Sequence, residues 1–113
     1  MGYKINPSEN VINTLGYNAV YLNNLALAKY FLKMNINNYP NSYNAYDSFG
    51  DYHVAVGNSG QATIMYKKAL SLYDNLETRK KLESISKQKI FIKIIIILKQ
   101  KKDVLKLVSY VMG

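Results

Sequence analysis

Four residues whose side chains carry out acid–base and nucleophilic chemistry lie close together in this chain. Asp47, Ser48, Asp51 and His53 fall within seven consecutive residues, and these are the residue types of a hydrolase triad. If residues 46–56 form a helix, Asp51 and His53 point about 200° apart around its axis and cannot meet. The chain also has no Gly-x-Ser-x-Gly nucleophile elbow. We therefore expect no catalytic residues and no enzyme activity.

The sequence also lacks the residue patterns of metal and cofactor sites. The chain has no cysteine and one histidine, so neither a cysteine nor a histidine-rich metal site can form. The carboxylates do not follow a calcium-loop pattern, and Gly57–Gly60 lacks the Gly-Lys-Ser/Thr of a phosphate loop. The sequence predicts no metal and no cofactor.

The positive charge is concentrated near one end of the chain. Of 113 residues, 49% are hydrophobic, enough for one small domain or a piece of a larger protein, and the net charge is +8. Five lysines against four carboxylates give residues 1–76 a charge of +1, whereas ten basic against three acidic residues give residues 77–113 a charge of +7. Because the basic residues are not interleaved with the tyrosines of the neutral part, we expect no nucleic-acid partner.

The sequence predicts neither a signal peptide nor a membrane span. The first ten residues contain no apolar stretch of the length that a signal peptide needs. The longest apolar run, Ile90–Leu98, is interrupted by Lys93 and is far shorter than the roughly 20 residues of a spanning helix.

A repeat of 34 residues organises the first two thirds of the chain. The stretch from Ile12 matches the stretch from Tyr46, with Gly16 over Gly50, Ala28 over Ala62 and Asn24 over Asn58. Each copy predicts two helices, at about 8–22 and 25–38 in the first copy and at about 43–56 and 61–73 in the second. Pro40 ends the first pair, and the Gly57–Gly60 stretch divides the second.

Small residues recur where the paired helices should cross. A glycine inside a helix costs about 1 kcal/mol relative to alanine, so Gly16 and Gly50 need a packing reason. We expect each to lie at the crossing of a hairpin, where a Cβ would push the helices apart, with Ala28 and Ala62 on the facing side.

These residues resemble the tetratricopeptide repeat, a 34-residue helix–turn–helix unit. The second copy carries the pattern of that family as Tyr46, Phe49-Gly50, His53, Ala62, Tyr66, Ala69 and Asp74, and the first as Ile12, Leu15-Gly16, Ala19, Ala28, Leu32, Asn35 and Pro40. Ala19, His53, Asn35 and Asp74 depart from the family pattern. His53 takes the place of a packing aromatic, so we expect it to be structural.

The resemblance implies an all-α fold of the α-solenoid type. We expect a lead-in over residues 1–8, one repeat over 9–42, a second over 43–76, a closing helix over 77–88 and a basic, apolar, helical tail over 89–113. A narrower resemblance is to the C-terminal repeats attached to some bacterial serine hydrolases and esterases. It implies that the chain is an accessory piece of such an enzyme and is periplasmic or secreted. Without that resemblance, the sequence predicts a cytoplasmic protein.

The family places its binding groove along the first helices of successive repeats. By helical phase that face collects Asn10, Asn13, Tyr17, Val20, Tyr21, Asn44, Asp47, Ser48, Asp51, Val54, Thr78, Lys81 and Ile85. Amide, hydroxyl and aromatic groups of this kind suit an extended peptide or a protein surface, so the expected partner is a protein. Because the face lacks the cationic grip of repeats that clamp carboxylate tails, we expect no acidic tail as the ligand.

The tail leaves three interpretations open. Lysine and aliphatic residues dominate from Lys87 onward, and the β-branched run Ile94–Ile97 favours a strand, whereas Val104–Met112 has helical periodicity. The tail is a lid over the open end of the repeats, or a segment that touches an anionic membrane or a partner, or accidental coding. Two repeats fall short of the usual three, so the lid, a homo-oligomer or a linked parent domain would have to supply the missing cover.

Overall fold

The computed structural model describes residues 7–112, and every regular element in that range is a helix. The helices are α1 (Glu9–Tyr21), α2 (Leu25–Asn38), α3 (Tyr43–Ala55), α4 (Ser59–Leu72) and α5 (Leu76–Met112). The all-α prediction is therefore confirmed. Of the lead-in expected over residues 1–8, residues 1–6 lie outside the described range, as does the last residue, 113.

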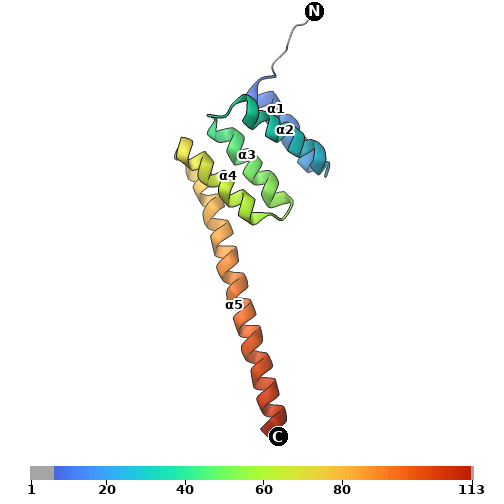
Figure 1. Ribbon diagram of the computed structural model, residues 1–113, viewed down its shortest axis with the longest axis vertical. Helices are drawn as coiled ribbons and strands as arrows, with labels where there is room; N and C mark the ends of the chain where they lie inside the picture. Colours follow the sequence, from blue (N-terminus) through green and yellow to red (C-terminus); the bar gives the residue numbers. More distant parts are fainter. Residues whose placement is uncertain (1–6, 113) are drawn as a thin grey trace, which may run out of the picture. The chain divides into compact units, whose positions relative to one another are not determined.

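Contacts divide the chain into two units, residues up to 82 and residues from 83 onward. In the first unit, α1 pairs with α2 and α3 pairs with α4, and the two hairpins meet through contacts of α3 with α2 and α1. Figure 1 shows the helices of each hairpin running side by side. A shared apolar core joins the hairpins and contains Ala19, Ala28, Leu32, Phe49 and Tyr52.

The helix boundaries repeat at the same 34-residue interval as the sequence. Ser8 and Ser42 cap the first helix of each hairpin, and each hydroxyl accepts the backbone N–H of the third residue along. Asn24 and Asn58 cap the second helices in the same way. The turns match as well, because both Asn23 and Gly57 have positive φ angles, 57° and 78°.

Gly16 and Gly50 lie where each hairpin is tightest. A Cβ at Gly16 would lie 2.4 Å from Cδ2 of Leu32, and one at Gly50 would lie 2.4 Å from Cε1 of Tyr66. Leu32 and Tyr66 are themselves 34 residues apart and buried, so neither can easily move aside. These contacts give glycine a physical reason at both positions.

The other residues expected to pack the repeats differ in their burial. Buried positions are Ala28, Phe49, Ala62, Tyr66 and Ala69. Tyr46 is half-buried, and its hydroxyl donates to the carbonyl of Pro40, which is itself exposed just after α2. Leu15 does not pack as expected, because 40% of its surface is exposed on the outer side of α1.

The segment from Leu76 to Met112 is one continuous helix. The expected end of a closing helix near residue 88 lies inside α5, and Ile94–Ile97 is helical rather than extended. β-Branched residues favour a strand only where a neighbouring strand and a pleated surface give them packing partners, and residues 7–112 contain no strand.

The second unit exposes its large apolar side chains from Ile90 onward. Every large apolar side chain from Ile90 to Met112 retains at least 47% of its surface. No helix among the described residues has both the length and the apolar composition that crossing a membrane requires.

Candidate functional site

Polar side chains from four helices converge on two carboxylates in the first unit. Asp47 and Asp51 lie one turn apart on α3, with their side chains 13% and 25% exposed. We call the group that surrounds them the Asp51 cluster. Its members are Tyr17 from α1, Asp47 and Asp51 from α3, Tyr66 from α4, and Thr78 and Lys81 from the first two turns of α5.

Hydrogen bonds link all six residues. Tyr17 Oη donates to Asp51 Oδ2 at 2.5 Å, and Tyr66 Oη donates to Asp51 Oδ1 at 2.6 Å. Thr78 Oγ1 donates to Asp47 Oδ1 at 2.6 Å. Lys81 Nζ bridges the two carboxylates, at 2.8 Å from Asp47 Oδ2 and 3.0 Å from Asp51 Oδ2. The carboxylates therefore act as acceptors that join α1, α3, α4 and the start of α5.

The cluster carries one uncompensated negative charge. Two carboxylates and one ammonium group give a net charge of −1 at neutral pH. Burial alone would lower the pKa of Lys81, but its hydrogen bonds to Asp47 and Asp51 and their charges raise that pKa overall. Lys81 Nζ also lies 5.8 Å from the ring centre of Tyr66.

Both tyrosines of the cluster are held in the neutral form. Burial, and then the hydrogen bond to the Asp51 carboxylate, raise the pKa of Tyr17 and of Tyr66 well above the ordinary value. The Ser48 hydroxyl acts on Tyr17 in the opposite sense, but it is the weaker influence. Neither phenol is therefore suited to act as a base near neutral pH.

Two contacts of the cluster join equivalent positions of successive 34-residue units. Tyr17 and Asp51 are 34 residues apart, and so are Asp47 and Lys81. A side chain on each first helix thus meets its own counterpart one unit further along the chain. Residues that align in the 34-residue repeat therefore contact each other directly.

The predicted binding-face residues fall into three groups, with Asn13, Val20 and Asn44 intermediate between the exposed and the buried ones. Tyr17, Asp47, Asp51 and Lys81 come together in the cluster, and Tyr66, which the sequence predicted only as a packing residue, joins them. The alignment at 34 residues placed Tyr17 over Asp51, which is the signal for that contact; nothing in the sequence marks the Tyr66 hydroxyl.

The second group, Asn10, Tyr21 and Val54, is exposed, and Tyr21 keeps 89% of its surface. Asn13, Val20 and Asn44 are half-buried.

The third group is buried and cannot line an open face. Ser48 has no exposed surface, Thr78 is 2% exposed and Ile85 is 7% exposed. Ser48 is buried because it shares one side of α3 with Ala45, Phe49 and Tyr52, and α3 packs against the first hairpin. The prediction of Ser48 as a binding-face residue is therefore wrong.

His53 lies apart from the cluster, in an aromatic setting. Its ring centre is 4.6 Å from that of Phe49 and 5.1 Å from that of Tyr52, and its buried Nδ1 has no hydrogen-bond partner among the described residues. Burial, and then the charge of Lys29, lower the pKa of His53. A triad histidine needs an acid or hydroxyl partner on this nitrogen. Within residues 7–112, no three acidic or histidine side chains are grouped to hold a metal ion.

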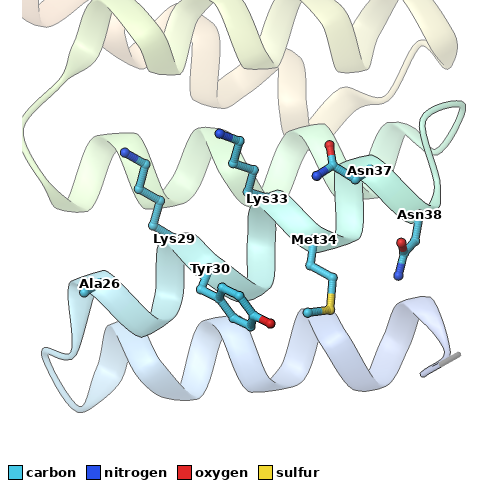
Figure 2. Close-up of a pocket in the computed structure, with 7 residues that line it drawn as sticks. All are labelled: Ala26, Lys29, Tyr30, Lys33, Met34, Asn37 and Asn38. Atoms are coloured by element: carbon cyan, nitrogen blue, oxygen red, sulfur yellow. The ribbon is translucent and has the colours of Figure 1, made fainter. Parts of the chain in front are cut away.

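A separate open pocket of about 520 Å³ runs along α2. Figure 2 shows Lys29, Lys33 and Asn37 on one side of it and Tyr30, Met34 and Asn38 on the other. Ala26 completes the lining, so all the lining residues come from one helix. Such side chains flank a ligand without enclosing it, and enclosure is what characterises small-molecule sites.

A comparison with protein families found no matching family model, and comparisons with curated proteins and with solved structures found no match either.

Proposed function

We propose that this chain is a protein-binding scaffold of the tetratricopeptide type, with no chemistry of its own. The observation that carries the proposal is the contact between equivalent positions, Tyr17 with Asp51 and Asp47 with Lys81. Such contacts arise when helical hairpins of one kind stack in a single direction, which is the construction of repeat scaffolds. Attachment to a serine hydrolase stays a prediction of the narrower resemblance.

The binding face that we propose is the Asp51 cluster with the exposed residues beside it in the repeat phase, Asn10 and Tyr21. The cluster is rich in hydrogen-bond acceptors and has a net charge of −1. A carboxylate accepts up to about four hydrogen bonds, so Asp47, which accepts two, retains capacity for a ligand. Peptides with an arginine or lysine and free backbone N–H groups match this surface, and acidic peptides do not.

Selection from a random peptide library tests this proposal, followed by calorimetric titration of the selected peptides. We expect the peptides to be enriched in basic residues, and Tyr21→Ala to weaken their binding about fivefold or more through the loss of ring contact. Tyr110→Ala is the matched control, because Tyr110 is 86% exposed and Tyr21 is 89% exposed. The control should leave the affinity unchanged.

Two results would count against this binding face. One is a set of selected peptides with no excess of basic residues. The other is equal binding by the parent chain and by Tyr21→Ala.

The second unit supports a second candidate function, contact with an anionic membrane surface. Seven lysines against Glu83 and Asp103 give residues 83–112 a charge of +5, and their large apolar side chains from Ile90 onward are exposed. A basic helix with uncovered apolar side chains binds at the interface of anionic bilayers. The chain should sediment with anionic vesicles and not with neutral ones, and Phe91→Glu should weaken that binding. Equal sedimentation with both vesicle types would exclude this function.

A further inference from the structure

Within residues 7–112, nothing covers one side of α1, whereas the equivalent side of α3 is buried. On α3, Ala45, Ser48, Phe49 and Tyr52 are each at most 8% exposed. Their counterparts 34 residues earlier form what we call the α1 stripe: Val11, Thr14, Leu15 and Asn18. All four are exposed, with Val11 at 51% and Leu15 at 40%. The spacing i, i+3, i+4, i+7 places the four on one helix face.

The structure shows what covers this side of a first helix. Helix α3 packs against both helices of the preceding hairpin, and α2 is the larger contact. Phe49 and Tyr52 share a core with Ala28 and Leu32, and Leu25 and Ile36 pack against the same core. The covering helix therefore presents aliphatic side chains at i, i+7 and i+11, those of Leu25, Leu32 and Ile36.

A hollow already lies on the α1 stripe. It has a volume of about 260 Å³ and is lined by Asn10, Val11, Thr14 and Leu15. None of these side chains is charged, so an apolar partner side chain could enter without burying an unpaired ion. On α3, the counterparts of Val11, Thr14 and Leu15, which are Ala45, Ser48 and Phe49, are buried.

We infer that the α1 stripe is a docking surface for a helical hairpin of the same kind, supplied by a partner protein. The second helix of that hairpin lies against Val11 and Leu15 as α2 lies against Ala45 and Phe49, and it carries aliphatic residues at the spacing of Leu25, Leu32 and Ile36. This surface shares only Asn10 with the proposed peptide-binding face, and the inference uses the packing of α2 on α3 rather than the proposed function.

A tethered probe tests the inference in the full chain. A second copy of residues 9–42, inserted directly before Glu9, keeps the 34-residue register and places a second α2 next to the α1 stripe. Because the chain has no cysteine, Leu15→Cys, made only in the original hairpin, gives a single thiol whose alkylation rate reports coverage. We expect the insertion to slow alkylation about tenfold or more.

Two controls separate docking from other effects of the insertion. Ile64→Cys places the thiol on α4 at a residue that is 53% exposed, and its alkylation should change less than about twofold. An insertion whose copy carries Leu25→Lys and Ile36→Lys should leave the Leu15→Cys thiol as reactive as in the parent chain. Circular dichroism verifies that each inserted copy is helical.

Three outcomes would overturn the inference. The first is unchanged alkylation of the Leu15→Cys thiol although the inserted copy is helical. The second is equal protection by the copy with two lysines. The third is a parent chain that dimerises in light-scattering measurements and becomes monomeric with Val11→Lys, because the stripe would then bind a second copy of this chain.

Discussion

Gly16→Ala adds one methyl group at the crossing of the first hairpin, and the structure sets its cost. The new Cβ would lie 2.4 Å from Cδ2 and 2.6 Å from Cγ of Leu32, where ordinary contact begins near 3.4 Å. Leu32 has no exposed surface, so it cannot swing into solvent to make room. Either the Leu32 side chain leaves its preferred rotamer or α1 moves away from α2.

The magnitude follows from two opposing terms. Overpacking a filled core costs about 1–3 kcal/mol. Replacing a helical glycine with alanine returns up to about 1 kcal/mol. We therefore expect Gly16→Ala to lower the free energy of unfolding by about 1–2 kcal/mol, which shifts Tm down by roughly 4–16 °C in a domain of this size.

Urea denaturation followed by circular dichroism measures this change, and Gly60→Ala is the matched control. Gly60 is also helical, but a Cβ there would meet only Asn58 Oδ1 at 3.7 Å, an ordinary contact. The control should raise the free energy of unfolding by up to about 1 kcal/mol. If Gly16→Ala were as stable as Gly60→Ala, close helix packing would not be the reason for glycine at position 16.

A double-mutant cycle with Leu32→Ala locates the clash. Leu32→Ala alone should cost about 2–5 kcal/mol, because it leaves a cavity. Combined with Gly16→Ala it should cost less, since the added methyl group then meets no Leu32 side chain and fills part of the space. Additive costs would place the effect of Gly16→Ala somewhere other than Leu32.

Three further predictions concern the charged and titrating groups. Asp51→Asn removes the charge that Tyr17, Tyr66 and Lys81 share, so it should lower the free energy of unfolding in urea by about 1–2 kcal/mol. The control is Asp74→Asn, at a side chain that is 69% exposed and pairs with Arg79, and it should cost less than about 0.5 kcal/mol. Equal costs would contradict a structural role for the cluster. The pKa values of Tyr17, Tyr66 and Lys81 are raised on folding, so the folded state keeps protons that the unfolded state releases. The urea midpoint should therefore fall as pH rises above about 10. A fall of the same size in Tyr66→Phe would contradict this assignment. The pKa of His53 is lowered on folding, so the protein should lose stability as pH falls below about 6.5. In the same assay, His53→Phe should lose less stability than the parent chain between pH 7 and pH 5. An identical loss in that variant would show that another group is responsible.

Local signals in the sequence were sufficient for the first four helices and most of their ends. Asn24, Ser42 and Asn58 are strong N-caps, and Pro40 cannot continue a helix, so the boundaries of α2, α3 and α4 follow from local chemistry. The 34-residue match also paired Tyr17 with Asp51 before any contact was known. Features that repeat in the sequence were thus predictable from one copy to the next.

Features that depend on neighbouring elements were not predictable in this way. Residue type and helical phase alone do not distinguish the burial of Ser48 from that of Leu15. Ser48 is buried because α3 packs on the first hairpin, and Leu15 is exposed because no described helix packs on α1 in the same way. The β-branched side chains of Ile94–Ile97 favour a strand only beside another strand, and residues 7–112 contain none. The Tyr66 hydroxyl reaches Asp51 because α3 and α4 are paired, which residue type alone does not reveal.

Tyr66 has two contacts at once, with its ring against the Cα of Gly50 and its hydroxyl on Asp51. The side chain of Tyr66 therefore both sets the spacing between α3 and α4 and holds the Asp51 carboxylate. A ligand that draws Asp51 toward itself would have to work against that spacing, and a looser hairpin would change the affinity in return, since thermodynamic linkage is reciprocal. Leu32, in the same place one unit earlier, has no hydroxyl, so the first hairpin contacts Asp51 only through Tyr17 on the outer surface of α1 and not through the side chain at its own helix crossing. An occupant of the cluster would thus be coupled to the helix spacing of the second hairpin alone.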